Sequence, residues 1–128
     1  MKVLIDTHTF LWFINGDRQL SRRAREIIED LGNERIISVI SLWEIAIKVK
    51  KDKMRLADPF DVLIPAELNR NIIDVLDFNI EHVSQVATLP LYSSEPFDRA
   101  LVAQAIVERL PVVSVDQVFD AYGVNRMW

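Results

Sequence analysis

The segment KVLIDTHTFLWFING, residues 2–16, contains the pattern on which the fold prediction rests. Val3 to Ile5 form a short apolar run bounded by charged residues, which is typical of a strand buried on both faces. Asp6 follows this run at once, and residues 7–14 have a helical pattern that ends near Gly16. A buried strand, an acid and a helix in direct succession predict the first unit of an α/β domain.

The alternation of strand and helix continues along the rest of the chain. Strand-like runs cover residues 35–38, 72–76 and 111–115. Helical patterns cover residues 21–31, 41–49, 59–69, 80–87 and 96–109, and a further short helix precedes a tail at 123–128. We therefore predict an α/β three-layer sandwich, in which a short, mainly parallel central sheet has helices on both faces.

The composition fits one domain that spans residues 1–128. Half of the residues are apolar, and the absence of cysteine excludes disulfides, thiol nucleophiles and thiolate zinc sites. The net charge of −4 argues against a basic reader of nucleic-acid sequence but not against a nuclease, whose acids bind metal. No signal-peptide pattern or membrane-length apolar run occurs, which predicts a soluble, cytoplasmic protein that does not bind membranes.

Four acids are predicted to meet at one edge of the sheet. Asp6 and Asp116 directly follow the strands at 3–5 and 111–115. Glu44 and Asp98 are expected in the first turns of helices that begin after the second strand and at Pro96. Because ligands of parallel α/β sheets bind beyond the carboxyl ends of the strands, this placement predicts a site formed by the four carboxylates.

Such a cluster would favour a bound cation. Two carboxylates about 5 Å apart repel by roughly 3 kcal/mol at an effective dielectric constant of about 20, so four together either have raised pKa values or bind metal. Oxygen ligands favour Mg²⁺ or Mn²⁺ over zinc. His8 is expected to pack or cap within its helix, and His82 is expected at the surface. Taken singly, each acid could instead cap a helix or complement the helix dipole.

Several local strings are similar to the successive motifs of a known family. They are LIDTHTFLW (4–12), ISVISLWEIAIK (37–48), EPFDRALVAQA (95–105) and VVSVDQVFDAYGV (112–124). Together they resemble the PIN domain and, more narrowly, the VapC-type ribonuclease toxins of bacterial toxin–antitoxin pairs. The resemblance implies a Mg²⁺- or Mn²⁺-dependent endoribonuclease that hydrolyses RNA phosphodiester bonds with a metal-bound water.

The resemblance also implies roles for individual residues. The acid quartet of the family matches Asp6, Glu44, Asp98 and Asp116. Asp6, Asp98 and Asp116 are the expected metal ligands, Glu44 is expected to orient water or a second metal, and Ser114 matches a supporting position. A homodimer and a cognate antitoxin whose C-terminal segment blocks the active site are further implications, and the high apolar content agrees with such interfaces.

Three basic residues are candidates for contact with RNA. Lys48 and Lys51 lie toward the end of the Glu44 helix, and Arg99 follows Asp98. Their alternative roles are structural: cations stabilise a helix C-terminus, and Arg99 could brace a neighbouring acid. Trp43 and other isolated aromatic residues are expected in the core.

Two other classes of function stay open at this stage. One is another Asp-dependent phosphoryl-transfer α/β domain, although a dehalogenase-type phosphatase would need an acid where His8 stands, and a receiver domain would need a Lys where Asp116 stands. The other is a PIN-fold binding module that is catalytically silent. Metal-dependent cleavage of RNA would distinguish the nuclease from both.

Overall fold

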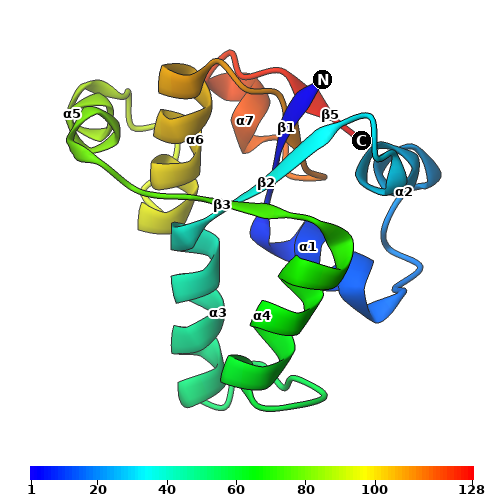
Figure 1. Cartoon of the computed structure of the whole chain (residues 1–128). Coiled ribbons are helices and arrows are strands. Elements are labelled where there is room, and N and C mark those ends of the chain that lie inside the picture. The colour runs from blue at the N-terminus through cyan, green and yellow to red at the C-terminus, as the bar shows by residue number, and fades with distance from the viewer.

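A sheet of five parallel strands forms the centre of the computed structural model, which describes residues 1–128 (Figure 1). The strand order is β3-β2-β1-β4-β5. The strands are β1 (Lys2–Ile5), β2 (Glu34–Ser38), β3 (Asp74–Leu76), β4 (Val112–Val113) and β5 (Arg126–Met127). The helices are α1 (Thr7–Asn15), α2 (Arg22–Glu29), α3 (Val39–Lys50), α4 (Phe60–Asn71), α5 (Ile80–Thr88), α6 (Pro96–Glu108) and α7 (Val118–Ala121).

The first strand is the centre of the sheet, with two strands on each side of it. Leu4 lies opposite Ile36 of β2 and Val112 of β4, both in parallel register. Val3, Leu4 and Ile5 have no exposed surface. The uninterrupted apolar run in the sequence is thus explained by a strand that has helices on each of its two faces.

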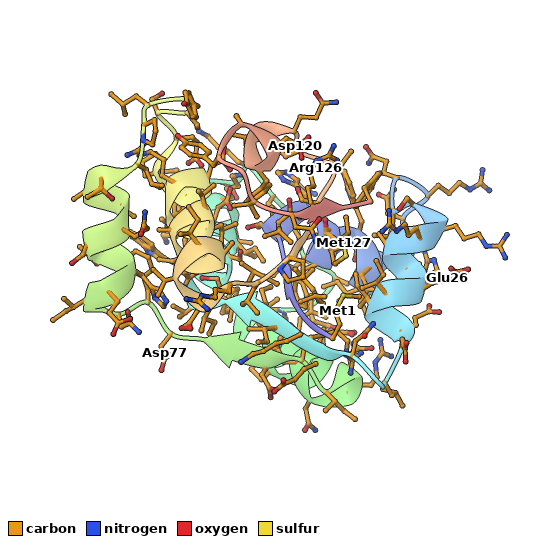
Figure 2. All side chains as sticks on the ribbon, turned by 90° about the horizontal axis from the view of Figure 1, so that it is seen from above. Met1, Glu26, Asp77, Asp120, Arg126 and Met127 are labelled. Carbon is orange, nitrogen blue, oxygen red and sulfur yellow. The ribbon has the colours of Figure 1, made fainter.

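Alternate residues of the strands belong to two separate cores. Val3, Ile5 and Val113 pack with apolar residues of α1, α2 and α4. Leu4 and Val112 pack on the other face with residues of α6 and α7. Figure 2 shows α2 and α5 on opposite sides of the molecule. The predicted three-layer α/β sandwich is therefore confirmed, and its sheet is parallel throughout.

The short ends of several elements differ from the prediction. The tail at 123–128 contains β5, whose two residues pair with β4 and were too few to show a strand pattern. The third helix begins at Val39 with Ser38 as its N-cap, so Glu44 lies in the second turn and not the first. The second helix ends at Glu29, and Leu31 beyond it is exposed. None of the helices combines the length and apolar character needed to cross a bilayer.

A buried cation joins two helices to the sheet. Arg35 of β2 is 4% exposed and donates to backbone carbonyls and not to a carboxylate. Its acceptors are Ile28 in the last turn of α2, and Asn71 and Ile72 at the end of α4. The carbonyl ends of helices carry partial negative charge, so they stabilise the guanidinium in place of an acid.

Replacing Arg35 by methionine should destabilise the fold. Arg35→Met would leave buried carbonyls without donors and should lower the free energy of unfolding by roughly 2 kcal/mol in urea titrations. Arg22→Met is the matched control, because the Arg22 side chain is 93% exposed and pairs only with Glu26. Equal stability of the two variants would show that the Arg35 contacts contribute little.

Candidate active site

Five carboxylates line one open cavity of about 610 Å³ at the carboxyl edge of the sheet. The four predicted acids Asp6, Glu44, Asp98 and Asp116 are all among them. The fifth is Glu95, which the sequence did not single out as part of the site. The structure therefore brings together the four acids that were predicted from their positions after strands and near the starts of helices.

The backbone explains how residues far apart in sequence reach this cavity. Asp6 follows β1 and is the N-cap of α1. Asp116 follows β4, which is the parallel neighbour of β1, so both chains leave the sheet at the same edge. Asp98 lies in the first turn of α6, and Glu44 reaches the cavity from α3.

Asp6 is the most buried of the acids and is held at both carboxylate oxygens. Its Oδ1 accepts from the backbone N–H of Thr9 at 2.9 Å, and its Oδ2 accepts from the hydroxyl of Ser114. Burial raises the pKa of Asp6, while the hydrogen bonds from Ser114 and Thr9 act in the opposite direction. The Ser114 oxygen also accepts from the backbone N–H of Asp116 at 2.9 Å, so it links two of the predicted ligands.

Asp98 has no N–H or O–H group that donates to its carboxylate, whereas Asp6, Glu44 and Asp116 each accept at least one hydrogen bond. The pKa of Asp98 is raised to about 7, first by burial and then by the charges of Glu95, Asp116 and Glu44, in that order. The protein thus places more negative charge around Asp98 than its own groups neutralise, which is the electrostatic condition for binding a cation.

Glu44 is in the opposite situation, because both of its carboxylate oxygens are paired. Oε1 lies 2.8 Å from Oγ1 of Thr7, and Oε2 lies 2.8 Å from Nζ of Lys48. The Thr7 oxygen is also 2.9 Å from Oγ of Ser41. A carboxylate only accepts, so the Thr7 proton is directed to Glu44 and Ser41 donates to Thr7.

Glu95 positions Asp98 through the start of the helix that carries it. As the N-cap of α6 it accepts from the backbone N–H groups of Phe97 at 3.2 Å and Asp98 at 2.6 Å. The available sequence signal was an acid directly before Pro96, since proline favours the first position of a helix. A role at the cavity could not follow from that signal, because it depends on where α6 meets the sheet.

The donor set fits a hard cation in its chemistry. The cavity offers carboxylate oxygens and no thiolate, which suits Mg²⁺ or Mn²⁺. No three His, Asp or Glu side chains are yet arranged around a common point as metal ligands. The unpaired carboxylate of Asp98 and the exposed Asp116 are the groups with the fewest protein contacts to give up on binding an ion.

The three basic residues proposed for RNA contact have different environments. Lys48 lines the cavity, whereas Lys51 is exposed beyond α3 and is not among the lining residues. Arg99 is not among the residues that line the cavity. Its guanidinium donates to the Tyr122 hydroxyl and to the backbone carbonyls of Val86, Leu89, Pro90 and Ser93. It fixes the loop before α6, and both of its terminal nitrogens are used in these contacts.

Of the two histidines, His8 packs against Trp12 within its helix as expected, and only His82 differs from expectation. His82 is buried and not at the surface: its Nδ1 accepts from the backbone N–H of Asn79 in a capping box, and its Nε2 lies 3.3 Å from Glu108. His8 is exposed and lines the acidic cavity. Asp120 does not reach the cavity; it pairs with Arg126 at 3.0 Å, and the two are neighbours in Figure 2.

Comparison with known proteins agrees with this architecture. Residues 3–125 match the family model of the PIN domain. None of the curated proteins matches the chain in sequence. Several solved structures share the fold at low identity, and three of them are described next.

The first is VapBC2 from Rickettsia felis bound to a DNA fragment from their promoter, with a TM-score of 0.74, 17% identity and coverage of 99% of this chain and 98% of that chain. The second is FitAcB from Neisseria gonorrhoeae, with a TM-score of 0.70, 19% identity and coverage of 100% and 97%. The third is a toxin–antitoxin complex from Klebsiella pneumoniae, with a TM-score of 0.69, 16% identity and coverage of 98% and 96%.

The negative charge around Asp98 predicts that the protein becomes more stable when Asp98 is replaced by a neutral residue, by an amount that depends on pH. The pKa of Asp98 in the folded protein, about 7, exceeds its ordinary value of 3.8, so the folded protein holds a proton in this window that the unfolded chain has lost. The contribution of Asp98 to the free energy of unfolding therefore falls as pH rises from about 4 to about 7.

In metal-free buffer, Asp98→Asn should be more stable than the parent at pH 8 by about 1–2 kcal/mol, after allowance for solvent screening, and the difference should vanish at pH 4. Urea unfolding at several pH values measures this. Asp58→Asn, at an exposed acid outside the cavity, is the control and should show no such trend. A constant difference between Asp98→Asn and the parent at all pH values would contradict the prediction.

Proposed function

This chain belongs to the PIN domain family, and we propose on that basis that it is a divalent-metal-dependent endoribonuclease and the toxin of a toxin–antitoxin pair. The observation that supports the enzymatic part is the carboxylate of Asp98. It is partly buried among four other acids and accepts no hydrogen bond from the protein. A group of this kind is costly for the fold, and a bound cation would remove the cost.

The predicted ligands remain Asp6, Asp98 and Asp116, which would hold Mg²⁺ or Mn²⁺ at the carboxyl edge of the sheet. When bound, such an ion would activate the attacking water and offset negative charge on the transferring phosphoryl group.

The residues of the chain would act mainly by positioning. Ser114 holds Asp6 and the backbone of Asp116 in a fixed relation, so two ligands share one support. Glu95 fixes the first turn of α6 and with it Asp98. The cavity is open to solvent along the sheet edge, which suits a polymeric chain that passes across it.

The cleavage assay separates this proposal from a silent binding module. Purified protein should cut a mixed, labelled RNA pool with Mg²⁺ or Mn²⁺ and not with EDTA. Asp6→Asn and Asp98→Asn should each lower the rate by at least about 100-fold, because each removes a ligand from a site with few. Asp120→Asn is the matched control, since Asp120 lies outside the cavity and pairs with Arg126.

Two results would count against the nuclease. One is the absence of metal-dependent cutting by folded, partner-free protein that also binds no Mn²⁺, which would favour a binding module. The other is cutting that persists in both Asp6→Asn and Asp98→Asn, which would indicate a contaminating nuclease. Circular dichroism of each variant shows whether it is folded.

The proposed partners are a cognate antitoxin and a second copy of the chain. The similar structure from Klebsiella pneumoniae is described as a toxin–antitoxin complex. On this chain, Val39 and Trp43 of α3 and Val83 of α5 expose large apolar surface near a shallow apolar cavity of about 360 Å³. Trp43 is 58% exposed and not in the core as predicted, although it contacts Phe97 edge to face. We propose that a homodimer would form through this surface.

Light scattering should then give about twice the 14.8 kDa mass of one chain for the parent protein. Trp43→Glu should yield a monomer, because it places a charge on the apolar contact surface. Leu31→Glu is the control: Leu31 is 73% exposed but lies beyond α2, on the other side of the molecule. A dimer that survives Trp43→Glu would place the interface elsewhere.

A further inference from the structure

The acids that line the cavity differ in how their charges are neutralised. Asp98 and Asp116 accept few or no hydrogen bonds from the protein. Glu44, by contrast, is paired with Thr7 and Lys48 through both of its carboxylate oxygens. Lys48 is the one lysine or arginine among the residues that line the cavity. Its ammonium group is therefore the one lysine or arginine cation that the protein itself places in the cavity.

The Lys48 ammonium is held by a buried support. It lies 2.8 Å from Oε2 of Glu44, a residue that is 9% exposed. Glu44 is fixed in turn by the hydroxyl of Thr7, which is buried and directly follows Asp6 in the chain. The position of the ammonium is thus tied to the same turn that positions the most buried acid of the site.

This ion pair differs from the ordinary surface pairs of the same protein. Arg22 and Glu26 have the same spacing on α2, but their side chains are 93% and 64% exposed. The side chains of Lys48 and Glu44 are 32% and 12% exposed. Exposed pairs of this spacing stabilise a helix by only a few tenths of a kcal/mol. Removing a carboxylate and an ammonium from water beside four further acids costs more than that, so helix stability alone does not account for this pair.

The other basic residues near this edge are not available for the same task. The guanidinium of Arg99 is used on loop carbonyls and Tyr122. Arg126 is paired with Asp120 and with the carbonyl of Ser114. Lys51 is outside the cavity. Lys48 makes one hydrogen bond to Glu44, and an ammonium group has three donors, so two remain for a further acceptor.

We propose that Lys48 takes the place of a second metal ion: it contacts the RNA phosphate directly, and Glu44 is the residue that positions it and not a metal ligand. The inference rests on the proposed ribonuclease function and specifies how many ions that site uses. A single ion would be held by Asp98 and Asp116, whose carboxylates have few or no protein donors, and the fixed ammonium beside Glu44 would neutralise phosphate charge. Lysine suits this role as a compact point charge.

The test combines a metal titration with RNA binding. Calorimetric or EPR titration of the parent protein with Mn²⁺ should give one ion per chain. Binding of a labelled single-stranded RNA is then followed by anisotropy with Ca²⁺ in place of Mg²⁺, after checking on a gel that the RNA stays intact. Lys48→Met should weaken binding about tenfold or more and lower the slope of log affinity against log salt by about 1. Lys48→Arg should retain most of the affinity.

Lys2→Met is the matched control, because Lys2 is exposed and begins β1 at the opposite edge of the sheet. It should change neither quantity. Two Mn²⁺ ions per parent chain, or equal RNA affinity and salt slope for Lys48→Met and Lys2→Met, would overturn the role of Lys48 while leaving the nuclease intact. A parent protein that binds neither Mn²⁺ nor RNA would overturn the proposed function, and this inference with it.

Discussion

Mutual repulsion among carboxylates at the carboxyl edge of the sheet is the constraint around which this structure is organised. Parallel pairing of β1 with β4 places Asp6 and Asp116 at the same edge, and α3 and α6 add Glu44, Glu95 and Asp98. Charges brought together in this way oppose folding unless something offsets them. The raised pKa of Asp98 shows that the protein offsets them only in part.

The hydrogen bonds that offset the repulsion are distributed unevenly among the acids. Backbone N–H groups and hydroxyls hold Asp6, Glu95 and Glu44, and these are the groups whose orientation must be fixed. Asp98 is left without a donor. A carboxylate without donors can respond to a cation, whereas a fully paired one cannot do so without losing hydrogen bonds. The acids that accept hydrogen bonds therefore support the site, and the acid without them is the one able to bind a cation.

Structural arginines maintain this arrangement from outside the cavity. Arg99 ties the ends of α5 and the following loop to Tyr122, and this loop leads directly into Glu95 and α6. Arg35 joins the ends of α2 and α4 to β2. In both cases the acceptors are backbone carbonyls or, for Arg99, also the Tyr122 hydroxyl, and none is a carboxylate, so the guanidinium groups fix the chain without pairing with the acids of the cavity. In the sequence alone, Arg99 was a candidate for contact with RNA because it follows Asp98.

The sequence by itself determined the α/β class and the identity of the four predicted acids near the cavity, because both depend on local features. Three apolar residues before Asp6 specify a buried strand, and the acid is a covalent neighbour of its end. Only the tertiary structure decided which residues contact one another across the fold. That Glu44 pairs with Thr7 and Lys48, that His82 is buried, and that Arg126 and Met127 form a fifth strand depend on packing between segments distant in sequence. Local periodicity reports which side of an element is buried, but it does not report which residue from elsewhere in the chain will face it.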